Sequence, residues 1–476
     1  MAKIEMTDRK IGEIGALLWG SFVEQMGRAV YGGIYDPACP SADERGFRRD
    51  VIRAVRDLKL PIVRYPGGNF VSGYDWKDGI GKERPRRLNL AWMQIEPNTV
   101  GLHEFYDWSR LAGTEVMMAL NLGTGTVRDA LELVEYCNFA GDTARTRLRR
   151  ANGREEPFGF RYWCLGNEMD GIWQIGCLSA EDYAHKARET SKLIKLIDPD
   201  IKTTLVGSSA PDLPTYPAWE RTVLDIAYEH VDYISLHRYY SHVEGGVSAY
   251  LAQYRDLSAY IETVRDIVAE TKARKNSAHE VKLALDEWNV WHRENDSSST
   301  KWQVSDVKVE NHYDFLDAML VANLICVMTK HCDVLEIGCF AQLVNVIGLI
   351  MTENGGRMFL QTSYYPFAFA SNYLRGRAVE TKVSGAGADL LNIAVCDRGD
   401  GISALCVNND ERNAALLEFE LPAGKITAQI MCAAPDEKNS FEDPEKVVPK
   451  EVQVSERGGR TVLEMPPLSI LTLRTE

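Results

Sequence analysis

The chain alternates short apolar runs with longer amphipathic segments from about residue 15 to residue 345. Continuous runs rich in Val, Ile and Leu are typical of parallel strands that are buried on both faces. Eight runs have this character, and they cover residues 15–24, 61–69, 115–123, 159–170, 201–209, 231–239, 281–290 and 334–345.

The segments between these runs have the spacing of amphipathic helices. In residues 180–197 the apolar side chains recur every three or four positions, as the helical repeat requires. Ser179 is a suitable N-cap for this helix, and Asp198-Pro199 ends it. Residues 247–272 and 310–330 have the same character. The pattern therefore predicts helices that alternate with the eight strands.

Eight strand–helix units of this length fit a (β/α)₈ TIM barrel of the α/β class with long loops, which we place at residues 16–375. A doubly wound open sheet is the alternative. After about residue 375 the helical spacing fades, and short, partly alternating runs appear between turn-forming residues. This pattern predicts a C-terminal antiparallel β-sandwich domain at 376–476, which we describe as jelly-roll-like. Residues 435–450, rich in Pro and charge, are expected to form a surface loop.

Composition narrows the classes of partner. The 476 residues are 45% hydrophobic, and 54 basic against 68 acidic side chains give a net charge of −14. Such a surface repels phosphates, so we expect no nucleic acid and no membrane as partner. The N-terminus lacks the features of a signal peptide, and no apolar run approaches the length of a membrane span. We therefore expect a cytoplasmic protein with free thiols among its ten cysteines.

Polar side chains gather where the predicted strands end. In a barrel of this kind the ends of the strands carry the catalytic residues on one face. Seven of the eight strands end in such groups, namely Glu24, the run Arg64 to Asn69, Asn121, Asn167-Glu168, the run His237 to Tyr239, the run Asp286 to Asn289, and Gln342. The pattern predicts a polar site at one barrel mouth.

Two carboxyl groups at this mouth suggest glycoside hydrolysis. That reaction needs one carboxyl group to protonate the leaving oxygen and a second, ionised one to attack the anomeric carbon or to activate water. Glu168 and Glu287 follow the fourth and seventh strands, so they can face each other across the mouth. Asn167 is placed to donate to a sugar hydroxyl. The charge of Glu287 would raise the pKa of Glu168 and so separate the two roles.

Other chemistries find little support. The sequence contains no phosphate-binding glycine loop, no Gly-x-Ser-x-Gly and no His-Glu-x-x-His, and its nine histidines are scattered. We expect no cofactor and no catalytic metal.

Five segments of the chain carry recognisable motifs. They include Arg-Tyr-Pro-Gly-Gly-Asn-Phe-Val-Ser-Gly-Tyr at 64–74, Trp-Cys-Leu-Gly-Asn-Glu-Met-Asp-Gly at 163–171 and Asp-Glu-Trp-Asn-Val-Trp at 286–291, with two more at 20–35 and 341–345. Together these segments resemble glycoside hydrolase family 51, the α-L-arabinofuranosidases. The resemblance covers nearly the whole chain. It departs from the family at 100–104, 236–246 and 347–350, beside the expected barrel mouth, which leaves the preferred linkage open.

The resemblance implies a retaining, exo-acting enzyme that releases terminal non-reducing α-L-arabinofuranosyl residues from arabino-oligosaccharides. Glu168 would be the acid/base and Glu287 the nucleophile. The family also implies that residues 1–15 join the sandwich, and that the protein is an intracellular homo-oligomer, commonly a hexamer. Residues implied to bind the furanose are Glu24, Asn69, Asn167 and Gln342; Arg64, His237 and Tyr239 would order the nucleophile, and Trp92 and Trp291 would form subsite walls.

Three alternatives remain open at this point. A β-xylosidase or an endo-β-1,4-glucanase could use the same scaffold and the same carboxylates, because a fold does not set sugar identity. A non-catalytic carbohydrate-binding protein would retain the tryptophans but would give no role to the two glutamates.

Overall fold

Eight parallel strands close into a barrel, as the apolar runs predict. The computed structural model describes residues 2–293, 301–421 and 424–476. Each predicted run contains one barrel strand, and the strands follow one another around the barrel in chain order. The strands are β2 (Leu17–Phe22), β3 (Ile62–Tyr65), β6 (Glu115–Ala119), β7 (Tyr162–Cys164), β8 (Lys202–Leu205), β9 (Tyr233–Tyr240), β10 (Lys282–Val290) and β11 (Leu335–Ala341).

Helices cover the outside of this barrel. They are α1 (Arg49–Leu58), α2 (Leu102–Ala112), α3 (Val127–Asn138), α4 (Ala144–Ala151), α5 (Ala180–Ile197), α6 (Ala218–Ala227), α7 (Gly246–Ala252), α8 (Tyr254–Lys275), α9 (Phe315–Lys330) and α10 (Tyr364–Tyr373). Helix α5 has the predicted bounds, and the Ser179 hydroxyl accepts a hydrogen bond from the Asp182 amide at its start. The single helix predicted over 247–272 is two helices, α7 and α8, which meet at Gln253. The helix predicted from residue 310 begins at Phe315.

Helix α9 is apolar around nearly its whole circumference, and its position explains this. It packs against α8, α10 and β10 on the barrel side and against β14, β15, β16 and β22 of the second domain. A helix enclosed on all sides has no polar face to present. Among its few polar residues, Asn323 donates a hydrogen bond to Asn409 and accepts one from Asn392. Helix α9 therefore joins the barrel to the second domain.

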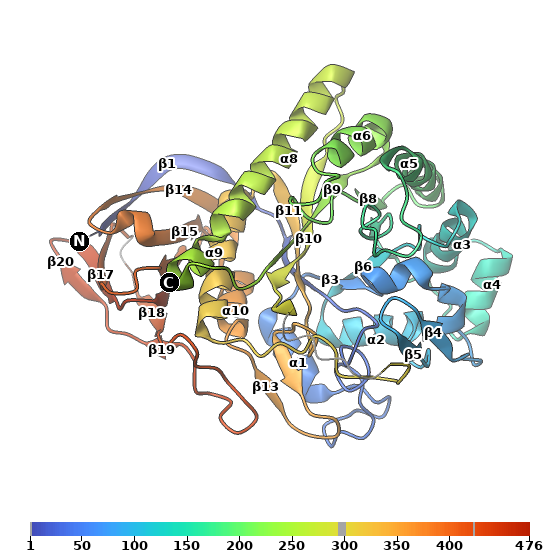
Figure 1. The fold of residues 1–476 in the computed structure, drawn as a ribbon, viewed down its shortest axis with the longest axis horizontal. Helices are drawn as coiled ribbons and strands as arrows, with labels where there is room; N and C mark the ends of the chain where they lie inside the picture. The colour runs from blue at the N-terminus through green and yellow to red at the C-terminus, as the bar shows by residue number, and fades with distance from the viewer. Residues whose placement is uncertain (1, 294–300, 422–423) are drawn as a thin grey trace.

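The second domain is a ten-stranded sheet that curls around a core of its own, at the opposite end of the molecule from α3 and α4 (Figure 1). The predicted C-terminal β-sandwich domain is confirmed, and its pairings are antiparallel except that of β1 with β17, which is parallel. The strand order is β19 (Lys450–Glu451), β18 (Ile426–Met431), β22 (Ser469–Thr475), β16 (Ile402–Asn408), β15 (Leu391–Asp397), β14 (Gly376–Gly385), β1 (Ala2–Ile14), β17 (Ala415–Phe419), β21 (Arg460–Met465) and β20 (Ser455–Arg457).

Both chain termini belong to this sheet. Strand β1 lies between β14 and β17, and Ile14 pairs with Gly376 while Ala2 pairs with Gly385. These pairings support the proposed division of the chain into a barrel at 16–375 and a sandwich at 376–476 that includes residues 1–15. The sequence patterns did not predict β14 or β21.

Residues 435–450 form the expected surface loop, and most of their side chains are exposed or half-buried. Two residues within it, Asn439 and Val447, are buried. The Asn439 side-chain amide donates to the carbonyls of Leu360 and Val447, and the Val447 amide donates back to Asn439. These bonds anchor the loop to β13 (Met358–Leu360), which forms a hairpin with β12 (Ile350–Thr352).

The structure also bears on the expected absence of a membrane span and on the expected free thiols. Across the described ranges, no helix has both the length and the apolar character that a bilayer crossing requires. All ten cysteines lie within these ranges and are free thiols.

Candidate active site

The strand ends converge on a cavity of about 660 Å³ at the mouth of the barrel. Its wall includes eight of the eleven side chains singled out from the sequence, namely Glu24, Asn69, Trp92, Glu168, Tyr239, Glu287, Trp291 and Gln342. The other three, Arg64, Asn167 and His237, are at most 2% exposed and lie directly behind the wall. Trp92 reaches the mouth from the turn between β4 (Arg87–Asn89) and β5 (Gln94–Glu96).

Glu287 is held by donors on both of its oxygens. Arg64 Nη1 donates to Glu287 Oε1 at 2.6 Å, and the Tyr239 hydroxyl donates to Oε2 at 2.7 Å. Arg64 also lies 3.3 Å from Asp286, and its Nη2 donates to Asn167 Oδ1 at 2.7 Å. Donors of this kind stabilise an ionised carboxylate and fix its direction.

A shift in register brings Asp286 and Glu287 to the same side of β10. Successive side chains of a regular strand point to opposite faces, so two neighbours would not normally meet one guanidinium. The pairing of β10 with β9 shifts between Ala284 and Glu287, and an irregularity of this kind re-aims side chains. The sequence alone carries no signal for this shift, and sequence reasoning therefore missed the contact of Asp286 with the site.

Glu168 lies opposite Glu287 in an environment that favours its protonated form. Its backbone has a φ of 44°, an uncommon value for a residue other than glycine. His237 Nδ1 is 3.0 Å from Oε1, and Trp173 Nε1 donates to Oε2 at 2.7 Å. Burial raises the pKa of Glu168 and the charge of Glu287 raises it further, and these effects outweigh the two hydrogen bonds, which lower it.

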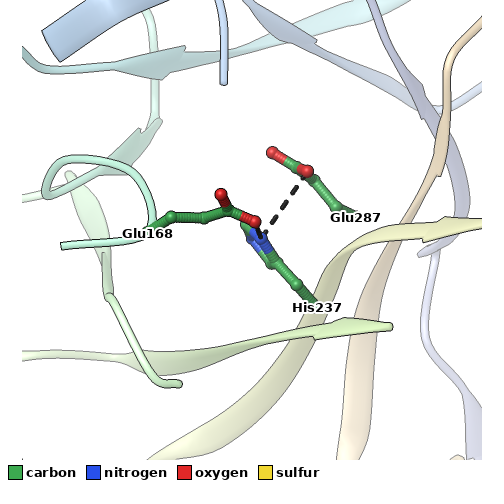
Figure 2. Close-up of side chains that lie close together, drawn as sticks. All are labelled: Glu168, His237 and Glu287. Carbon is green, nitrogen blue, oxygen red and sulfur yellow. Dashed lines mark hydrogen bonds and ion pairs between the residues drawn. The ribbon is translucent and has the colours of Figure 1, made fainter. Parts of the chain in front are cut away.

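His237 links the two glutamates, as Figure 2 shows. Its Nδ1 lies 3.0 Å from Glu168 Oε1 and 3.6 Å from Glu287 Oε2, and its Nε2 lies 3.3 Å from Asp286 Oδ1. Burial alone would lower the pKa of His237, but the charge of Glu287, together with Asp286 and Glu168, raises it to about 10. The imidazole is therefore a cation at neutral pH; its Nδ1 is hydrogen-bonded to Glu168 Oε1, and its Nε2 faces the Asp286 carboxylate.

Burial also raises the pKa of Glu24, to about 8. Its Oε1 accepts hydrogen bonds from Trp92 Nε1 and from the Phe70 amide, both at 2.8 Å. Gly68 makes room for this carboxyl group, since a Cβ at that position would lie 2.5 Å from Glu24 Oε2. At neutral pH Glu24 is largely protonated, so it can donate a hydrogen bond as well as accept one.

Asn167 does not line the cavity in this structure, and its contact with a sugar hydroxyl stays a prediction. It is fully buried, and its Nδ2 donates to Asn69 Oδ1 at 3.2 Å and to Gln174 at 3.4 Å. Asn167 therefore orients Asn69, which does line the cavity. A residue that lines the cavity and one that is buried behind its wall can occupy the same position relative to the end of a strand. The sequence does not distinguish the two, whereas their burial in the structure does.

Trp173 is a member of the site that the strand-end pattern did not single out as a partner of Glu168. It follows Glu168 by five residues in an irregular loop, and its ring is 48% exposed. Another tryptophan of the wall, Trp291, contacts Tyr239 edge-on with ring centroids 5.2 Å apart. Aromatic faces at the mouth of a cavity can pack against the C–H surface of a sugar.

Comparison with known proteins identifies the kind of site. Residues 54–258 match the model of an α-L-arabinofuranosidase 1 domain, and residues 286–469 match that of an α-L-arabinofuranosidase C-terminal domain. A protein of Halalkalibacterium halodurans described as an intracellular exo-α-(1→5)-L-arabinofuranosidase is 49% identical over 379 residues, which are 79% of this chain and 76% of that protein.

Two proteins of Bifidobacterium longum match over more of the chain. An exo-α-(1→6)-L-arabinofuranosidase is 39% identical over 494 residues, covering 97% of this chain and 94% of that protein. The solved structure of a family 51 α-L-arabinofuranosidase superposes with a TM-score of 0.95 at 36% identity, covering 100% of this chain and 99% of the other.

The hydrogen bond from Trp173 to Glu168 predicts a measurable pH effect. Replacing Trp173 with Phe keeps an aromatic ring but removes a donor to the ionised carboxylate, so the pKa of Glu168 should rise. If Glu168 is the general acid, as predicted from the sequence, the alkaline limb of kcat/KM follows its protonation, and we expect this limb to move to higher pH by about one unit. The measurement is a pH profile with a chromogenic aryl glycoside. Trp302→Phe, at an exposed tryptophan on another loop, is the control, and an unmoved limb in Trp173→Phe would contradict the assignment.

Proposed function

The chain belongs to glycoside hydrolase family 51, the α-L-arabinofuranosidases, and we propose that it removes terminal non-reducing arabinofuranosyl residues with retention of configuration. The observation that carries the proposal is the pair Glu168 and Glu287. Their facing oxygens lie within 4.8 Å of each other, with His237 between them. Retaining enzymes place the two carboxyl groups about 5–5.5 Å apart, whereas inverting enzymes leave roughly 6.5–9.5 Å for a water molecule.

In the first step Glu287 attacks the anomeric carbon while Glu168 transfers its proton to the leaving oxygen. Arg64 and Tyr239 hold the Glu287 carboxylate and aim it, and the raised pKa of Glu168 keeps the proton available. Formation of the glycosyl–enzyme bond removes the charge of Glu287. The pKa of Glu168 then falls, and Glu168 acts as base toward the water molecule that releases arabinose.

The furanose is held by the polar groups deep in the cavity. Protonated Glu24, Asn69 and Gln342 offer both donors and acceptors to its hydroxyls, and Trp92 and Trp291 form the walls. The carbonyl oxygen of the Gln342 side chain accepts from the Glu24 amide at 3.1 Å, which fixes the direction of this side chain. Donors and acceptors in fixed directions favour one stereochemistry of the sugar.

The natural substrates that we propose are (1→5)- or (1→6)-linked arabino-oligosaccharides, fragments of arabinan or arabinoxylan. The two relatives named above are described as exo-acting on these two linkages, which supports the same mode of action here. We place the protein in the cytoplasm, because relatives of about half identity are described as intracellular.

Substitution of the two glutamates should separate their roles. Glu287→Ala should lose activity on every substrate, on the order of 10⁴-fold or more, because no nucleophile remains. Glu168→Ala should lose about 10²–10⁴-fold on substrates with poor leaving groups and much less on dinitrophenyl glycosides, with azide restoring turnover. Initial rates over a series of aryl α-L-arabinofuranosides measure this. Glu181→Ala, at an exposed glutamate of α5, is the control, and an equal loss on all leaving groups without rescue would refute the acid/base role of Glu168.

A panel of three aryl glycosides tests the sugar. We expect kcat/KM for the α-L-arabinofuranoside to exceed that for the β-D-xyloside and the β-D-glucoside by at least about 100-fold, because unpaired polar groups in the cavity penalise the wrong hydroxyl pattern. Linear (1→5)- and (1→6)-linked arabino-oligosaccharides then rank the linkages. Preference for the xyloside or for a β-glucan would replace the proposed substrate with one of the alternatives.

We also propose, on the family resemblance, that the chain forms a homo-oligomer, and a hexamer in particular. Light scattering coupled to size-exclusion chromatography should then give a mass about six times that of the chain. Elution as a monomer at micromolar concentration would reject this assembly.

A further inference from the structure

Three potential metal ligands face one another at the base of the cavity. They are Glu168 Oε1, His237 Nδ1 and Glu287 Oε2, and all three atoms lie within 4.8 Å of one another. The three side chains come from the ends of β7, β9 and β10 and point toward a common centre (Figure 2). Glycoside hydrolysis does not require a metal, so an ion bound by these three atoms would have a role other than catalysis.

The spacing fits a small tetrahedral cation. Zinc bonds to histidine nitrogen at about 2.0–2.1 Å and to carboxylate oxygen at about 2.0–2.2 Å, so tetrahedral ligands are about 3.3–3.5 Å apart. His237 Nδ1 lies 3.0 Å from Glu168 Oε1 and 3.6 Å from Glu287 Oε2, on either side of that value. Only the two carboxylates need to approach each other.

Each ligand is already oriented by a group behind it. Metal-bound histidines usually donate their second ring nitrogen to a carboxylate, which fixes the tautomer and the ring plane. Asp286 Oδ1 is in that position, 3.3 Å from His237 Nε2. Arg64 and Trp173 fix the far oxygens of Glu287 and Glu168 in the same way. The three candidate ligand atoms therefore have outer contacts typical of a built metal site.

Charge also favours a dication here, because the carboxyl groups of Glu168, Glu287 and Asp286 surround His237. Glu168 and Glu287 line the cavity, so water or a sugar hydroxyl can reach an ion held between them.

We propose that Glu168, His237 and Glu287 form an inhibitory site for one divalent transition cation of the zinc class. The bound ion occupies the place of the anomeric centre and takes both catalytic carboxylates out of action. The ion is an inhibitor and not a cofactor, since the reaction needs these oxygens free. Mg²⁺ and Ca²⁺ are excluded by their demand for six or more oxygen ligands.

The inhibition rests on the proposed function, whereas cation binding does not. Binding and inhibition are therefore measured separately. Isothermal titration of the full chain with Zn²⁺ reports binding directly. The double variant Cys177→Ser/Cys432→Ser is the background, because these two exposed thiols are competing zinc ligands outside the site. We expect one Zn²⁺ per chain and an affinity that L-arabinose weakens. In rate measurements Zn²⁺ should raise the apparent KM for an aryl α-L-arabinofuranoside and leave kcat unchanged.

Variants of the ligands identify the site. His237→Gln and Glu168→Gln should each weaken Zn²⁺ binding at least about 100-fold, and Asp286→Asn should weaken it about 10–100-fold through the orientation of His237. His185→Gln, at an exposed imidazole of α5, is the matched control and should bind Zn²⁺ as the background does. Thermal unfolding without metal checks that each variant is folded.

A crystal soaked in Zn²⁺ should show an anomalous peak about 2.0–2.2 Å from the three atoms. Binding that persists in folded His237→Gln and Glu168→Gln, or inhibition that lowers kcat and not the affinity for substrate, would overturn the proposal. If the unsubstituted chain has no glycosidase activity, the proposed function is refuted. The titration then still decides whether the cation site exists.

Discussion

The guanidinium of Arg64 is the group on which the arrangement of the mouth depends. It is 1% exposed and meets Glu287, Asp286, Asn167 and the Cys164 thiol at the same depth in the barrel. An unpaired charge at this depth would cost several kcal/mol, so the acidic partners and the base are stable only together. Arg64 holds the Glu287 carboxylate in place, and the charges of Glu287 and Asp286, together with Glu168, raise the pKa of His237 to about 10. Removing any one of these charges would change the protonation of the others.

The acidic side chains of the mouth show how burial and charge give identical groups different properties. Glu287 has two strong donors and serves as an anion, Glu168 faces that anion and tends to keep its proton, and Glu24 is neutral because burial dominates. The glycine at position 68 belongs to the same arrangement, since the Glu24 carboxyl group occupies the space that any side chain would need. Chemical roles here follow from the surroundings of each group and not from its type.

Much of this fold and site could be predicted from the sequence, for identifiable reasons. Buried parallel strands give continuous apolar runs, so all eight barrel strands were found, and a capped helix such as α5 had clear ends. Polar residues at strand ends indicated Glu168 and Glu287. The rest depended on tertiary contacts: the shift in β10 that turns Asp286 inward, the burial of Asn167 behind the wall, and the reach of Trp173 back to Glu168. None of these leaves a periodic signal in the chain.

The position of β1 has a consequence for how the protein is made. On the ribosome the first fourteen residues emerge before any of their sheet neighbours, because β14 and β17 lie beyond residue 375. At about 5–20 residues per second, the ribosome needs roughly 20–70 s to supply those partners. Through that interval a thirteen-residue strand has both edges unpaired, although its Lys, Arg, Asp and Glu side chains discourage pairing with other chains. The barrel can form during translation, whereas the second domain can be completed only when the last strands have left the ribosome.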